Sequence, residues 1–164
     1  MLILFISCKN TPEHVPNQQQ SPPPAKIGEI TEITLERSIC HGECPAYKVT
    51  FRSNGSATYT GGAYSQFIGV YEADSESCPE CHFGQLREWL KIQKFFDLQD
   101  AYHENLIDDS RIKVTIIYND KKKTVVSNDS RDPIELWGVA MAIDGVVSKI
   151  KWKKSASTPN SMKK

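Results

Sequence analysis

Residues 78–82 read Cys-Pro-Glu-Cys-His, which places two thiols and an imidazole within five positions. Two cysteines at this spacing followed by histidine are typical of c-type haem attachment, in which both sulfurs form thioethers and the histidine binds iron. The pattern fixes only three residues, so it also arises by chance. The same cysteine pair precedes a predicted helix, whose amino terminus lowers a thiol pKa and favours thiol–disulfide exchange. Cys78, Cys81 and His82 therefore allow a haem- or metal-binding redox protein.

A second pair, Cys40 and Cys44, is separated from Cys78 by 33 intervening residues. The two pairs together offer zinc four sulfur donors, with His82 as a further candidate ligand. The 33-residue separation is longer than that of common zinc ribbons, and an oxidising compartment would compete for the thiols. The alternative is a pair of structural disulfides, for which four cysteines allow three pairings. We expect local pairing, Cys40 with Cys44 and Cys78 with Cys81, and no resident cofactor.

The fifth cysteine, Cys8, follows the apolar run Met1–Ile6 and the small residue Ser7. The run is far too short to span a bilayer as a helix. It resembles the end of a bacterial lipoprotein signal peptide, which is cleaved before a cysteine that receives a diacylglycerol. Phe5 is bulkier than the usual aliphatic residue, and no basic segment precedes the run. We expect residues 1–7 to be a signal-peptide remnant and Cys8 to be lipidated.

The composition divides the remaining chain into three parts. Residues 8–29 hold the lipidated cysteine and a stalk rich in proline and glutamine, which has too few apolar side chains to fold. Residues 30–152 form one domain, and residues 153–164 form a lysine-rich tail predicted to be disordered. The resemblance to lipoproteins implies attachment to the membrane in the bacterial cell envelope. Lys9 stands where an aspartate retains some lipoproteins at the inner membrane, which favours the outer membrane.

Apolar periodicity predicts an α+β domain. Residues 29–38, 47–52, 57–59, 67–73, 111–118 and 124–127 alternate as strands do, with turn signals at Asn54-Gly55 and Asn119-Asp120. Helical spacing links Phe83, Leu86, Leu90 and Phe96. A second helix begins at Asp132-Pro133 and carries the stripe Leu136, Ala140, Ile143, Val147 and Ile150. We therefore predict an antiparallel sheet in the order β-β-β-(β)-α-β-β-α, with the helices packed on one face.

Residues 40–47 read Cys-His-Gly-Glu-Cys-Pro-Ala-Tyr. This segment resembles a family of uncharacterised, mostly bacterial exported proteins marked by the signature C-x-G-x-C-P-x-Y. The matching residues are Cys40, Gly42, Cys44, Pro45 and Tyr47. In that family the signature lies between a first strand and a hairpin, and the later elements follow the order predicted here. The resemblance implies a fold and an export route but no activity.

The sequence favours a binding role over catalysis. It contains no G-x-S-x-G, no phosphate-binding glycine loop and no H-E-x-x-H. The 20 basic and 20 acidic residues balance, which argues against nucleic acid as a partner. Tyr47, Tyr59, Tyr64 and Tyr71 could line a groove for a glycan or protein partner, although packing on the sheet is the simpler explanation. We predict a non-enzymatic binding or structural lipoprotein with disulfide-pinned loops, and keep the redox protein as the alternative.

Overall fold

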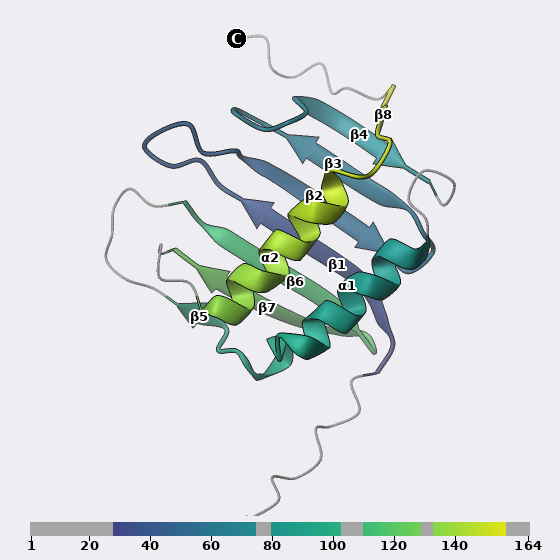
Figure 1. Ribbon diagram of the computed structural model, residues 1–164, viewed down its shortest axis with the longest axis vertical. Coiled ribbons are helices and arrows are strands. Elements are labelled where there is room, and N and C mark those ends of the chain that lie inside the picture. Colours follow the sequence, from purple (N-terminus) through teal and green to yellow (C-terminus); the bar gives the residue numbers. More distant parts are fainter. Residues whose placement is uncertain (1–27, 75–79, 103–109, 129–132, 157–164) are drawn as a thin grey trace, which may run out of the picture.

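The computed structural model describes residues 28–74, 80–102, 110–128 and 133–156. Within these ranges, Glu80 and Cys81 are described by their backbone alone. Within these residues, eight strands form one sheet and two helices cross one of its faces (Figure 1). The strands are β1 (Ile30–Arg37), β2 (Tyr47–Arg52), β3 (Ala57–Gly61), β4 (Gly69–Ala73), β5 (Ala101–Tyr102), β6 (Ile112–Tyr118), β7 (Lys121–Ser127) and β8 (Lys153–Lys154). The two α-helices are α1 (Glu80–Ile92) and α2 (Ile134–Val147), and a single turn of 3-10 helix, η1 (Phe95–Asp97), follows α1.

The strand order is β5-β7-β6-β1-β2-β3-β4-β8. The pair β5–β7 is parallel, and the other pairs that the structure describes are antiparallel. The α+β class and the packing of both helices on one face agree with the prediction. The predicted order of elements is wrong, because it lacks β5, β8 and η1 and places Lys153 and Lys154 in the tail. A strand of two residues carries no periodicity, so alternation cannot reveal it.

Two predicted turns lie where the sequence places them. Gly55 between β2 and β3 has a φ of 83°, and the side chain of Asn54 accepts a hydrogen bond from the amide of Ser56. Asn119 and Asp120 between β6 and β7 have φ values of 46° and 57°. Two consecutive residues in the left-handed region suit the twist of a tight hairpin, and Asn and Asp tolerate that conformation.

The core lies between the sheet and the helices. The predicted α2 stripe is buried, and so are Phe83, Leu86 and Leu90 of α1. The prediction is wrong for the last residue of the α1 stripe, because Phe95 is fully buried in the core and Phe96 is only half-buried. The cause is Lys94, whose φ of 48° is not helical, so the helical spacing of α1 does not continue to Phe96. None of the helices that the structure describes is long and apolar enough to cross a membrane.

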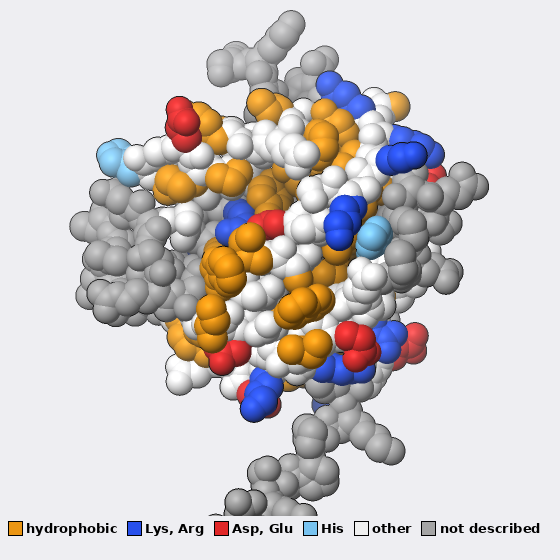
Figure 2. Space-filling view, viewed as in Figure 1, with side chains coloured by type: hydrophobic (Ala, Val, Ile, Leu, Met, Phe, Trp, Pro, Cys, Tyr) orange, Lys and Arg blue, Asp and Glu red, His pale blue; other side chains and the backbone are white. Residues whose placement is uncertain are grey.

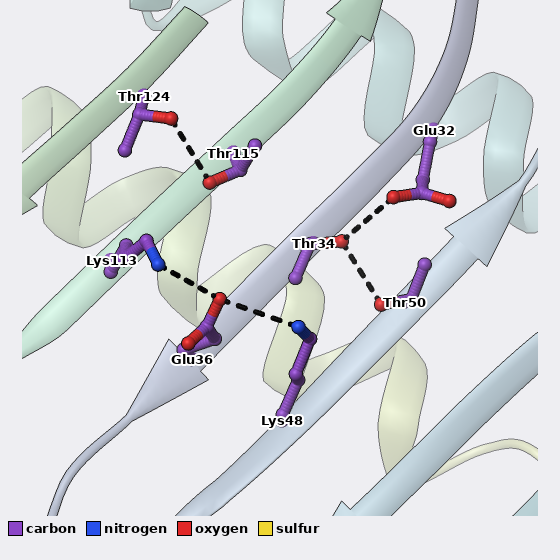
Figure 3. A network of polar contacts seen from close by, with 8 residues as sticks. All are labelled: Glu32, Thr34, Glu36, Lys48, Thr50, Lys113, Thr115 and Thr124. Atoms are coloured by element: carbon purple, nitrogen blue, oxygen red, sulfur yellow. Dashed lines mark hydrogen bonds and ion pairs between the residues drawn. The ribbon is translucent and has the colours of Figure 1, made fainter. Parts of the chain in front are cut away.

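The opposite sheet face carries polar side chains in rows (Figure 3). One row crosses five neighbouring strands and consists of Thr124, Thr115, Thr34, Thr50 and Thr58. The hydroxyls of Thr34 and Thr50 lie 3.0 Å apart, and those of Thr115 and Thr124 lie 3.2 Å apart. In the next row the Glu36 carboxylate lies 3.2 Å from Lys113 Nζ and 3.6 Å from Lys48 Nζ. Cross-strand pairs of this kind stabilise the sheet, and here they also satisfy the hydroxyls of Thr34, Thr50 and Thr115, which are buried.

Candidate functional site

The first predicted disulfide is present. Cys40 and Cys44 are bonded in the loop between β1 and β2, with their Cα atoms 5.5 Å apart. This agrees with the local-pairing hypothesis for these two residues. A zinc site that uses all four cysteines needs thiolates, and in this state Cys40 and Cys44 supply none to a metal.

The other predicted cysteine sites fall outside the described part of the chain. Cys8 and Cys78 are not described, and neither is the side chain of Cys81. The lipidation, the second disulfide and the haem attachment therefore stay predictions. Among the described side chains, no three of histidine, cysteine, aspartate or glutamate gather closely enough to hold a metal. His82 lies in the first turn of α1, and its buried Nδ1 has no hydrogen-bond partner in the described structure.

Tyr47, the last residue of the C-x-G-x-C-P-x-Y segment, belongs to a closed triangle of polar groups. The guanidinium of Arg37 donates from Nη2 to Asp144 Oδ2 over 2.7 Å and from Nε to the Tyr47 hydroxyl oxygen over 3.1 Å. The Tyr47 hydroxyl donates to Asp144 Oδ1. The side chains of Arg37 and Asp144 are only 17% and 30% exposed. We call these three residues the Arg–Tyr–Asp triad.

Strand register explains how the triad assembles. Arg37 follows Ile33 and Leu35 on the helix-facing side of β1, and it lies directly opposite Tyr47 of β2. The disulfide loop joins these two paired residues, so the bond between Cys40 and Cys44 constrains the connection immediately beside the triad. Helix α2 crosses above and brings the carboxylate of Asp144 to both partners.

The sequence patterns considered above did not single out Arg37 and Asp144. Each nevertheless left a signal, because Arg37 is a charged residue on the core-facing side of β1 and Asp144 borders the core-facing side of α2. Asp144 lies next to Ile143 in a helix whose other residues, apart from Glu135, are neither acidic nor basic. A buried charge needs a partner of opposite sign. The inward-facing Arg37 on β1 meets that need.

Burial and neighbouring charges fix the protonation of Tyr47 and Arg37. Burial raises the pKa of Tyr47 far above its usual value, and the Asp144 carboxylate raises it further, while Arg37 offsets only part of this change. Burial alone would lower the pKa of Arg37, but Asp144 and Tyr47 together raise it. At neutral pH Tyr47 is therefore a neutral donor and Arg37 is a cation. The triad is built to hold a shape rather than to exchange protons.

A surface pocket of about 380 Å³ opens beside the triad. Its wall combines Arg37 and Asp144 with Pro45, Tyr47, Tyr59, Gln66, Met141 and Val147. The rings of Tyr47 and Tyr59 stack with centroids 5.3 Å apart, and Tyr59 also packs against Trp152 at 5.5 Å. Of the four tyrosines proposed to line a groove, only Tyr47 and Tyr59 line this pocket. Tyr59 is 1% exposed, so packing on the sheet explains most of its surface.

The raised pKa of Tyr47 gives a testable dependence on alkaline pH. The folded state keeps the Tyr47 proton at pH values where a tyrosine in the unfolded chain, with a pKa near 10.0, has lost it. The contribution of Tyr47 to the free energy of unfolding is therefore complete below pH 10. It declines as the pH rises further, by up to about 1.4 kcal/mol per pH unit. We expect Tyr47→Phe to flatten the fall in unfolding free energy between pH 9.5 and pH 11, measured by urea denaturation. Tyr59, whose pKa burial also raises, provides the residual slope.

The disulfide should stabilise the fold modestly. It closes a ring between residues only four apart, so it removes little entropy from the unfolded chain. We expect the double variant Cys40→Ser/Cys44→Ser to lose about 2 kcal/mol of unfolding free energy. Urea denaturation of the variant against the wild-type protein, both without reductant, measures this loss. Equal stability of the two proteins would show that the bond serves the shape of the loop and not the stability of the fold.

Comparison with protein-family models identifies the family of the chain. The model of a family described as a domain of unknown function, DUF6438, matches residues 31–147. The matched segment runs from β1 to the last residue of α2, so it contains the disulfide loop and the whole triad. No curated protein matches the chain.

Proposed function

Since the chain belongs to the DUF6438 family, whose function is unknown, we propose that it is a non-enzymatic binding module of the bacterial cell envelope. In this proposal a lipid on Cys8 attaches the chain to a membrane, preferentially the outer membrane. The stalk of residues 8–29 spaces the domain from the lipid surface. The apolar run before Cys8 and the segment rich in proline and glutamine after it support this location.

The observation that carries the binding role is the rigid wall of the pocket beside the triad. Tyr47 is held by Asp144 and Arg37, and Pro45 next to it adjoins the disulfide at Cys44. Holding contact residues in place before a ligand arrives lowers the entropy cost of binding. The polar groups of the triad form hydrogen bonds with one another. This arrangement favours recognition of a ligand by shape over a chemical step.

The lining suggests the chemistry of the ligand. Pro45, Tyr47 and Met141 offer apolar surface, while the amide of Gln66 and the partly exposed carboxylate of Asp144 offer hydrogen-bonding groups. A pocket of this mixed character suits a segment with both an apolar and a hydroxyl or amide part. We propose a peptide or glycan segment of an envelope polymer as the ligand class.

The pocket can be tested with soluble peptidoglycan fragments, which contain both peptide and glycan. The chain has three methionines, and Met141 is the one in the pocket. We expect the methyl resonance of Met141 to shift on titration while that of Met162 stays unchanged. Gln66→Ala should weaken the response, and Gln99→Ala, an exposed residue outside the pocket, should not. No shift of Met141 with these fragments would overturn the proposed ligand class.

The anchor can be tested by mass. The intact protein purified from a bacterial envelope should begin at Cys8 and carry the added mass of a diacylglycerol, and a Cys8→Ser variant should lack it. The four remaining cysteines should resist alkylation in denaturant until a reductant is added. An unmodified Cys8 in the envelope fraction would overturn the lipoprotein assignment.

A second candidate is the redox protein that uses Cys78, Cys81 and His82. The observation in its favour is the buried Nδ1 of His82, which lacks a hydrogen-bond partner in the described structure and is a group that binds metals well. The same mass measurement separates the two proposals. An added haem mass, or a metal that leaves on denaturation and frees alkylatable thiols at Cys78 and Cys81, would replace the binding module with this second candidate.

A further inference from the structure

The outer face of the helix layer is unusually apolar. Five large apolar side chains point outward there: Trp89 and Ile92 of α1, and Ile134, Trp137 and Met141 of α2, with exposures between 42% and 68%. Residues 134, 137 and 141 are spaced by three and four positions, so they form one stripe along α2. Figure 2 shows this side of the molecule, where hydrophobic side chains gather over both helices. We call these five residues the helix face.

A groove of about 440 Å³ runs between the two helices within this face. Its walls include Trp89 and Trp137, and small residues of α2, Gly138, Ala142 and Gly145, lie along it. Among the residues that line the groove, Lys149 is the one with a charged side chain. The groove is thus a largely apolar surface, with the amides of Gln85 and Gln93 and one cation among its lining residues.

Further positive charges lie around the helix face. Lys94 follows α1, and Lys149 and Lys151 follow α2, all three exposed. On α1 the carboxylate of Glu88 is engaged by Lys91 at 2.7 Å. Glu135, in the first turn of α2, is an acid at the far end of that helix from Lys149. Cations beside an apolar surface complement anionic lipid headgroups above hydrocarbon.

We propose that the helix face docks on the surface of an anionic lipid bilayer. Tryptophan is enriched where hydrocarbon meets headgroups, because its ring is apolar and its N–H can reach water or a phosphate. Trp89 and Trp137 enter this interface, and Lys149 meets a headgroup phosphate. The inference rests on the proposed membrane attachment, since a lipid on Cys8 keeps the domain near the bilayer and raises the local concentration of the two surfaces.

The test uses the full chain with Cys8→Ser, so that no acyl chain contributes to binding. Vesicles of phosphatidylglycerol and phosphatidylethanolamine are compared with vesicles of phosphatidylcholine alone, by co-sedimentation and by tryptophan emission. We expect binding to the anionic vesicles with a blue shift of emission, and at least tenfold weaker binding to phosphatidylcholine. Trp137→Ser and Lys149→Glu should each weaken binding to the anionic vesicles about tenfold.

The matched control is Ile68→Ser, because Ile68 is 69% exposed and lies between β3 and β4, outside the helix face. It should bind as the parent does, and circular dichroism should show that all variants fold. Equal binding by Trp137→Ser and the parent would assign vesicle affinity to the apolar residues 1–7 or to the lysine-rich tail, and would overturn the proposal. So would a concentration-dependent dimer that Trp137→Ser dissociates, because a second copy would then cover the face. The mass of Cys8 tests the anchor separately, so either idea can fail without the other.

Discussion

Asp144→Ala is expected to lower the free energy of unfolding by about 3 kcal/mol. The substitution leaves the guanidinium of Arg37 without its counter-ion and the hydroxyl of Tyr47 without its acceptor, and both groups lie against the core. Removing one member of a partly buried polar network costs more than the net value of the intact contacts, because the remaining members stay desolvated. Urea denaturation at neutral pH measures the loss.

The matched control is Glu36→Ala on the opposite face of the sheet. Glu36 also contacts two basic residues, but the side chains of Lys48 and Lys113 are 56% and 33% exposed, against 17% for Arg37, so water can solvate both ammonium groups once the carboxylate is lost. We expect a loss below about 1 kcal/mol. If Asp144→Ala costs no more than Glu36→Ala, the triad does not stabilise the domain and the rigid pocket wall loses its physical basis.

Gly61→Ala is expected to be at least as damaging, with a loss of about 3 kcal/mol. A Cβ at this position would lie 1.7 Å from the carbonyl oxygen of Phe67 and 2.8 Å from the ring of Tyr59. The first contact is with backbone, so the connection between β3 and β4 must move. Because Phe67 packs edge-on against Tyr59, the movement would reach the pocket. Thermal unfolding and the Met141 methyl resonance should both change.

Gly84→Ala provides the comparison for this effect. Gly84 lies within α1, and outside its chain neighbours and its own helix backbone no heavy atom of the described residues lies within 4 Å of a Cβ added there. Alanine in a helix interior is favoured over glycine, so stability should rise by about 1 kcal/mol. A loss of stability in Gly84→Ala similar to that in Gly61→Ala would show that the crowding at Gly61 is not the cause.

Local patterns in the sequence were sufficient for most of the fold. Alternation at Tyr47, Val49 and Phe51 correctly assigned the core-facing side of β2. Both hairpin turns lie where they were expected, with positive φ values at Gly55, Asn119 and Asp120. The errors arise where the structure depends on a contact rather than a pattern. Strands β5 and β8 exist because a neighbouring strand offers hydrogen bonds to two residues, and nothing in their own composition announces this.

The candidate site was predictable only in part. The spacing of Cys40 and Cys44 indicated a local bond, and Tyr47 was singled out by the resemblance to a family signature. The partners Arg37 and Asp144 stand 107 positions apart, and only the register of β1 and the crossing of α2 bring them within 2.7 Å. A single sequence indicates that each of these charged residues needs a partner of opposite charge. It does not indicate which residue that partner is.

The central position of β1 constrains how the chain can fold. Strand β1 pairs with β2, which follows it after a short loop, and with β6, which lies much later in the sequence. Joining Thr34 to Thr115 closes a loop of roughly 80 residues, at an entropic cost on the order of 4 kcal/mol before any contact repays it. Until β6 has been synthesised, one edge of β1 stays open to pairing with other chains. Native assembly is therefore a late and slow event, and a chaperone that shields β1 would protect the nascent chain at its most vulnerable point.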